Sequence, residues 1–133
     1  MTVDGDVVGE IGAGLVILLG VGEGDSDVEA ALLADKVSKL RVFDDGAGRM
    51  DRSLLDIGGA ALCISQFTLY GDVRRGLRPS FTDAADPAIA ERLYDQFCRD
   101  LEGSGVPVSK GRFGARMSVS LVNEGPVTLL LEA

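Results

Sequence analysis

Histidine and tryptophan are absent from this chain of 133 residues, and cysteine occurs only twice. Without an imidazole the chain cannot form a Ser-His-Asp or Cys-His triad, and it has no H-E-x-x-H zinc motif. Its two cysteines do not have the C-x-x-C spacing of a zinc or thioredoxin-type site. Any catalysis must therefore use backbone groups, hydroxyls, carboxylates, cations or the substrate itself.

Long apolar runs are also missing. No run reaches the roughly 18 residues that a membrane-spanning helix needs, and the acidic N-terminus differs from a signal peptide. Cys63 and Cys98 each lie among apolar neighbours, as expected for buried, reduced thiols. The length and the 46% content of hydrophobic residues fit a single domain, residues 1–133, with its own core. We therefore expect a cytoplasmic protein that contacts no membrane.

Basic residues are scarce, because 13 Lys and Arg stand against 21 Asp and Glu, for a net charge of -8. Every charged residue among the first 35 is acidic, whereas the remaining acids and bases balance. This distribution argues against a general duplex-binding protein. Basic residues gather within 74–78 and 110–116, however, so contact with one end of a nucleic acid remains open.

Hydrophobic periodicity predicts a mixed α/β domain in which a sheet is flanked by two helices. The expected strands are a hairpin at 2–10 with Asp4-Gly5 as its turn, a run at 15–21 buried on both faces, and runs at 60–69, 106–109, 117–122 and 127–132. The expected helices are 25–40, capped by Asp25 or Ser26, and 87–103, capped by Asp86 and carrying an apolar stripe of Ala90, Leu93, Tyr94, Phe97, Cys98 and Leu101.

One candidate site is the sequence Ser65-Gln66-Phe67-Thr68-Leu69, at the end of an expected strand. Two hydroxyls, an amide and exposed backbone N–H groups could line a pocket there. Such N–H groups can stabilise a developing oxyanion without any titratable side chain. The pattern alone favours the plainer interpretation, a strand that turns polar as it reaches solvent.

Two further stretches carry alternatives of the same kind. Residues 123–128, with the sequence N-E-G-P-V-T, form either a hairpin turn or, with a cis Gly125-Pro126 bond, a wedge of bare backbone. The loop at 74–81 carries three arginines and Phe81, which could meet phosphate and a base. Its plain interpretation is a solvated charged loop.

Taken together, these segments resemble the D-aminoacyl-tRNA deacylases of the D-Tyr-tRNA deacylase type. The pairing of S-Q-F-T-L at 65–69 with N-x-G-P-V-T at 123–128 is the specific feature, and the resemblance runs from about residue 3 to the C-terminus. Shorter matching segments lie at 11–15, 40–43, 48–50, 78–81 and 113–115.

The resemblance implies a hydrolase that cleaves the ester between a D-amino acid and the 3′-terminal adenosine of tRNA, and that also clears glycine mischarged on tRNA. Such enzymes perform chiral proofreading in translation quality control by rejecting L-amino acids. They are cytoplasmic homodimers without metal or other cofactor. The ribose 2′-hydroxyl of the substrate is thought to assist the attacking water, while the protein positions the ester and stabilises the oxyanion.

The resemblance also implies the site residues. Ser65, Gln66, Phe67 and Thr68 would line the catalytic pocket, with the N–H groups of Phe67 and Thr68 near the reacting carbonyl. Gly125-Pro126 would be cis and would enter the pocket of the partner subunit. The expected substrate-binding residues are Asn123, Gly125, Pro126, Arg78 and Phe113.

The chain departs from the family at three places. Family members begin with an additional strand carrying a Q-R-V segment, so the sheet is expected to lack its first strand. Lys110 stands where Thr is common, and Arg116 stands where an uncharged or acidic residue is common. Two alternatives follow: an inactive tRNA-binding relative, or a small-ester hydrolase with Thr68 as nucleophile, although no base is placed to activate it.

Overall fold

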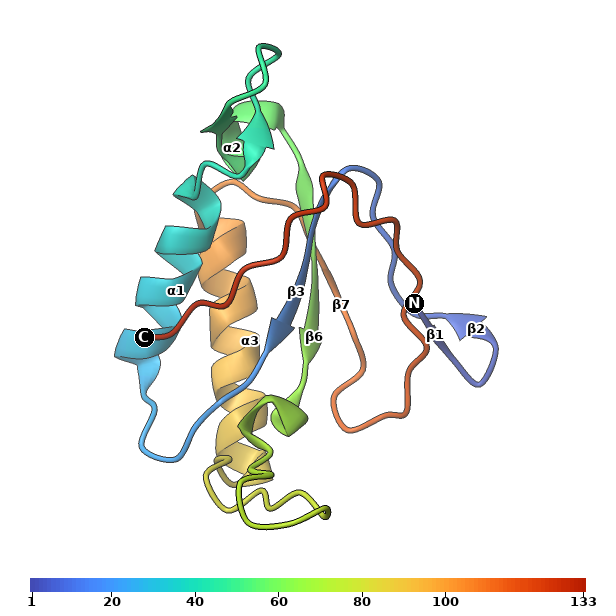
Figure 1. The fold of residues 1–133 in the computed structure, drawn as a ribbon, viewed down its shortest axis with the longest axis vertical. Helices are drawn as coiled ribbons and strands as arrows, with labels where there is room; N and C mark the ends of the chain where they lie inside the picture. Colours follow the sequence, from blue (N-terminus) through green and yellow to red (C-terminus); the bar gives the residue numbers. More distant parts are fainter.

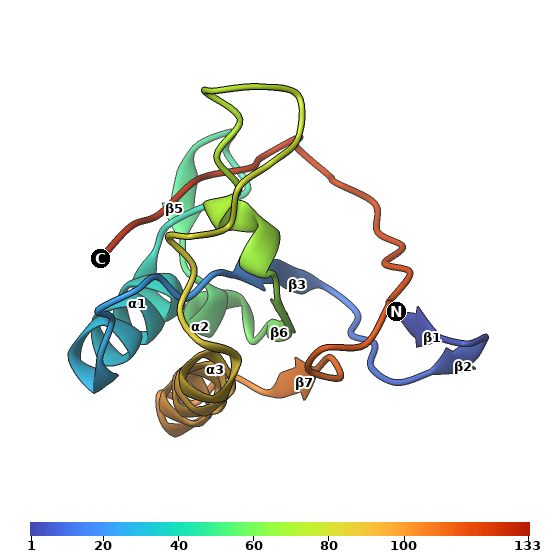
Figure 2. The ribbon, with the colours of Figure 1, turned by 90° about the horizontal axis from the view of Figure 1, so that it is seen from below.

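The computed structural model describes all 133 residues and centres on a three-stranded parallel sheet in the order β3-β6-β7 (Figure 1). Its strands are β3 (Gly14–Leu19), β6 (Ala60–Ser65) and β7 (Val108–Lys110). Helices α1 (Asp27–Lys39) and α3 (Pro87–Gly103) cover one face (Figure 2). The smaller elements are β1 (Thr2–Val3), β2 (Asp6–Val7), β4 (Phe43–Asp44), β5 (Met50–Arg52), α2 (Leu54–Ile57) and the 3₁₀ helix η1 (Phe67–Tyr70). The mixed α/β class is as predicted.

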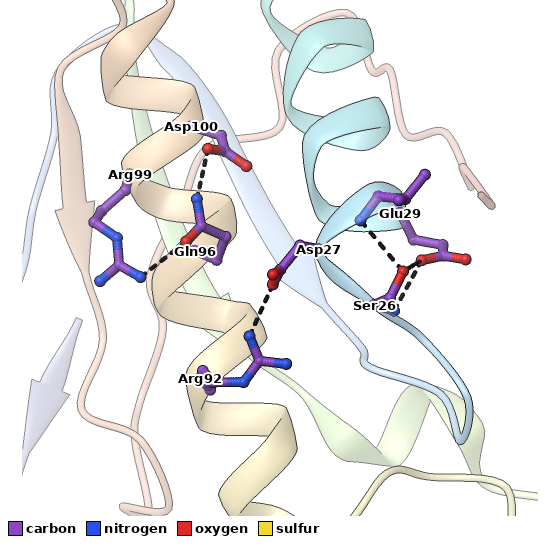
Figure 3. Close-up of polar contacts among 8 residues, drawn as sticks. Ser26, Asp27, Glu29, Arg92, Gln96, Arg99 and Asp100 are labelled. Carbon is purple, nitrogen blue, oxygen red and sulfur yellow. Dashed lines mark hydrogen bonds and ion pairs between the residues drawn. The ribbon is translucent and has the colours of Figure 1, made fainter.

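Helix α1 begins where the sequence predicts, and Ser26 is its cap. The Glu29 carboxylate accepts a hydrogen bond from the Ser26 N–H, and the Ser26 hydroxyl accepts one from the backbone of the first turn. These two bonds form a capping box. The Asp27 carboxylate then pairs with the Arg92 guanidinium of α3 at 2.8 Å, which links the two helices near their N-termini (Figure 3). Both side chains are exposed, so this pair contributes little to stability.

Helix α3 supplies the core. All six residues of the predicted apolar stripe are buried. Tyr94, Phe97, Cys98 and Leu101 pack with residues of α1, β3 and β6, whereas Ala90 and Leu93 pack with Val21 just beyond β3. Asp86 precedes the helix as expected, but its side chain makes no capping bond. The buried Tyr94 hydroxyl donates to the Cys63 carbonyl at 2.6 Å and accepts from the Gly111 N–H at 3.1 Å. Tyr94 therefore ties α3 to β6 and to the loop after β7.

The predicted hairpin at 2–10 is present, whereas the strand predicted at 15–21 is less buried than expected. The hairpin at 2–10 is confirmed, with Asp4 and Gly5 both at positive φ in its turn. The strand predicted at 15–21 forms as β3 but is not buried on both faces, because the two helices cover only one face of the sheet (Figure 2). Leu18, for example, is 48% exposed.

The second half of the chain has fewer strands than predicted. The strand predicted at 60–69 ends at Ser65, where the backbone turns into η1, and the one at 106–109 forms as 108–110. The strands predicted at 117–122 and 127–132 do not form, apart from one bridge between Ser118 and Thr2. A strand needs the backbone of a neighbour to bond with, and apart from this bridge these segments make no ladder of backbone bonds with another strand.

The C-terminal segment lies apart from the helices. After β7 the chain passes β1 and then crosses the sheet on the face opposite α3 (Figures 1 and 2). Only Leu131 of this last stretch packs against the main core. None of the helices combines the length and the hydropathy needed to cross a membrane.

Candidate functional site

The junction of β6 and η1 forms the centre of the candidate site. The Gln66 N–H donates to the Leu19 carbonyl at 2.8 Å, which fixes the point where β6 ends. Because η1 begins at Phe67, the N–H groups of Phe67 and Thr68 have no acceptor within the helix. Both residues are exposed, and Ser65 and Gln66 are half-buried. Two successive N–H donors without an acceptor in the chain thus lie on exposed residues at the carboxyl end of the central strand.

Side-chain contacts around Thr68 do not activate its hydroxyl. The Gln66 amide donates to the Thr68 Oγ1 atom, and no carboxylate or amine bonds to it. Neither thiol offers a substitute nucleophile, because Cys63 and Cys98 are both buried in the core. A hydrogen bond with Cys98, together with burial, also raises the pKa of Cys63 far above its ordinary value. No three acidic or cysteine side chains gather closely enough to hold a metal ion. The chemistry that this arrangement offers is hydrogen bonding by backbone donors.

The loop that follows η1, residues 71–86, packs back onto it. The rings of Phe67 and Phe81 meet edge to face, with 5.0 Å between centroids. Asp72 and Ser80 exchange two backbone hydrogen bonds of 2.7 and 2.9 Å, which close the loop at its base. Arg78 is exposed, and the loop that carries it lies at the same end of the sheet as η1 (Figure 1).

Phe113 lies at this end of the sheet as well. Its ring is half-buried, 6.3 Å from that of Tyr94 between centroids, and it packs against the cluster that contains Val21, just beyond β3. The sequence identified Phe113, but it gave no role to Tyr94, which holds the loop 111–116 through Gly111. The hydroxyl within an otherwise apolar stripe was the available signal, because buried tyrosines usually bond through it.

Residues 123–128 form a separate, self-contained turn. The Asn123 side chain donates to Thr128 Oγ1 at 2.9 Å and accepts from the Val127 N–H at 3.2 Å. The Gly125-Pro126 bond is cis, as the resemblance implies, and both residues are exposed. No hydrogen bond joins this turn to Ser65–Thr68 within the chain. The two halves of the predicted site are therefore not brought together in a single copy.

Comparison with known sequences gives matches over nearly the whole chain. A family model described as D-Tyr-tRNA(Tyr) deacylase matches residues 1–132. A protein of Roseiflexus sp. (strain RS-1) named D-aminoacyl-tRNA deacylase is 62% identical over 133 residues, covering 100% of this chain and 86% of its own length. A protein of Lacticaseibacillus casei (strain BL23) with the same name is 55% identical over 132 residues, with 99% and 89% covered.

Solved structures share the fold. The structure titled "c-Myc DNA Unwinding Element Binding Protein" superposes with a TM-score of 0.91 at 37% identity, covering 99% of this chain and 90% of that one. A second, titled "Structural Analysis of a probable eukaryotic D-amino acid tRNA deacylase", has a TM-score of 0.61 at 19% identity, with 76% and 74% covered. The second likeness concerns the fold alone.

Proposed function

The chain belongs to the D-Tyr-tRNA(Tyr) deacylase family and hydrolyses D-aminoacyl-tRNA, and we propose that it does so with backbone donors at the start of η1. Water adds to the ester carbon, the ester C–O bond breaks, and a D-amino acid and the adenosine hydroxyl are released. The single observation that carries this proposal is the pair of free N–H groups at Phe67 and Thr68. They are suited to hold the oxyanion of the tetrahedral intermediate.

Selection against L-amino acids is proposed to come from the turn at 123–128 of a second copy. Gly125 has no side chain and Pro126 has a fixed φ, so the turn presents rigid backbone. Backbone placed beside the substrate Cα would collide with an L side chain and leave room for a D side chain. Glycine has neither, so such a site also hydrolyses glycine mischarged on tRNA.

A homodimer is supported by the apolar surface of the C-terminal segment. Large hydrophobic side chains there are strongly exposed in the single chain, and Val122 is 90% and Leu130 is 79% accessible. Monomeric proteins rarely expose such a continuous apolar stretch. A second copy that covers it would also carry its exposed turn 123–128 toward the first copy's η1. Ser65, Gln66, Asn123, Arg78 and Phe113 are proposed to position the substrate, and we place the enzyme in the cytoplasm.

The decisive test compares the two enantiomers of one substrate. We expect D-Tyr-tRNA to be hydrolysed rapidly and L-Tyr-tRNA to remain acylated, with Gly-tRNA also hydrolysed. Release of radiolabelled amino acid over time measures all three rates. Equal hydrolysis of both tyrosyl enantiomers, or of neither, would overturn the proposal.

Replacement of Thr68 by alanine separates backbone catalysis from a covalent mechanism. Because the Thr68 N–H is retained, we expect kcat to stay within about threefold of the wild type, whereas loss of a nucleophile lowers kcat by about 10⁴ or more. Single-turnover deacylation of D-Tyr-tRNA measures the difference. A near-complete loss of turnover in a folded Thr68→Ala protein would favour the small-ester hydrolase with Thr68 as nucleophile.

A further inference from the structure

A polar cavity lies within the loop that follows η1. It has a volume of about 330 Å³ and is lined by eight residues of segment 72–83, none of them hydrophobic. That volume falls in the range of small-ligand sites, about 300–1,000 Å³. Most such sites are apolar, however, and this one is lined by arginines, aspartates and hydroxyls. Its chemistry suits a charged, hydrated ligand.

The arginines of this cavity differ in what they bind. Arg74 forms a two-pronged pair with the Asp72 carboxylate, at 2.9 Å from Nε and 2.8 Å from the terminal nitrogen. This pair lowers the pKa of Asp72 to about 2, so the carboxylate stays charged and Arg74 stays in place. Arg75 and Arg78 have no carboxylate within ion-pair distance. Two guanidinium groups with unused donors are therefore available to an oxyanion such as a phosphate, the kind of group that arginine binds best.

The cavity is placed beside the candidate active site. The same loop holds Phe81 against Phe67 of η1, where the oxyanion donors lie. A tRNA whose terminal adenosine reaches η1 must lead its preceding nucleotides, and their phosphates, across the neighbouring surface. The Glu23 N–H donates to the Asp83 carbonyl, so the acidic turn near Glu23 lies beside Asp83. Because these acidic residues repel a polyanion, it is favoured on the side of the loop that carries the arginines.

From this placement we propose that Arg75 and Arg78, supported by the Asp72–Arg74 pair, form a subsite for backbone phosphates of the single-stranded 3′ end of tRNA. The inference rests on the proposed function, because it takes the ester to lie at η1. The ligand chemistry is that of successive phosphodiesters, bound without reading of base identity. The wider chain is acidic, so this loop supplies local attraction that the net charge of -8 does not.

The test uses two substrates that share the ester but differ in phosphates: D-Tyr-tRNA, and D-tyrosyl-adenosine, which has none. For R75Q/R78Q we expect KM for D-Tyr-tRNA to rise about tenfold, as for two exposed charge contacts. The slope of log affinity against log salt should fall by about 0.7 for each phosphate that the protein no longer neutralises. For the single variant R75Q, whose residue has no proposed role at the ester, hydrolysis of D-tyrosyl-adenosine should not change. R75K/R78K should restore most of the affinity, because lysine keeps the charge.

The control is Arg99→Gln, which removes one positive charge from α3, as R75Q does from the loop; Arg99 bonds only to Gln96 (Figure 3). Unchanged KM and salt slope for R75Q/R78Q would show a merely solvated loop and overturn the inference. Equal losses for R75Q on both substrates would also overturn it, since Arg75 would then act on the ester or adenosine. If the wild type hydrolyses neither substrate, the proposed function fails. Binding of uncharged tRNA to the same variants then still tests the phosphate subsite.

Discussion

Replacement of Phe67 by proline is expected to lower kcat for D-Tyr-tRNA by about 10² to 10³, the usual effect of removing one oxyanion donor. Proline lacks the N–H but fits the first position of a helix, where that N–H has no intrahelical acceptor. Gln66 precedes it with φ -137° and ψ 82°, outside the α-helical region that proline disfavours in its predecessor. The substitution therefore removes a donor while leaving η1 able to form.

Phe67→Ala is the matched control, because it also removes the ring that contacts Phe81 but keeps the backbone N–H. We expect Phe67→Ala to affect mainly KM, and the difference in kcat between the two variants to measure the donor. Pre-steady-state deacylation and thermal melting of both proteins give the comparison. Equal kcat values for two equally stable variants would show that this N–H does not face the reacting carbonyl.

The geometry at η1 is compatible with the absence of histidine. A site that works through backbone donors needs no titratable side chain, so it can occur in a chain without an imidazole. Sequence reasoning could locate such a site only through residues 65–69, whose polar side chains mark the end of β6. It could not see the donors themselves, because every residue other than proline carries an N–H. These donors are available because η1 begins at Phe67. The sequence predicts a strand that continues to residue 69, so the start of this helix was not predicted.

Local signals predicted the helices well. The capping serine of α1, the Asp-Pro start of α3 and its apolar stripe each depend on neighbours within a few residues. The segments 117–122 and 127–132 have equally apolar sequences, yet they form no strands in the single chain. Strand formation depends on a partner edge that local sequence does not specify. The same exposed segments support the proposed dimer, so the failed strand predictions and the assembly have one physical cause.

Replacement of Gly14 by alanine is expected to have the largest effect on stability. An added Cβ would lie 1.8 Å from the Ala60 carbonyl oxygen, at the first paired position of β3 and β6. No side chain can move to relieve this overlap, because the obstacle is backbone. Gly14 also has φ +156°, which an L side chain rarely adopts. Strain and overpacking together should lower the free energy of unfolding by about 3 kcal/mol or more.

Gly12→Ala is the control, since an added Cβ there meets nothing within 4 Å. Its effect on the free energy of unfolding should stay within about 1 kcal/mol. Urea unfolding followed by circular dichroism compares the two variants, and failure of Gly14→Ala alone to fold would agree with the expectation. A Gly14→Ala protein as stable as Gly12→Ala would show that β3 does not pair with β6 in this register. Gly14 and η1 lie at opposite ends of the sheet. The folded fraction of Gly14→Ala should therefore keep the wild-type kcat, because the substitution weakens the pairing of β3 with β6 and leaves the catalytic groups in place.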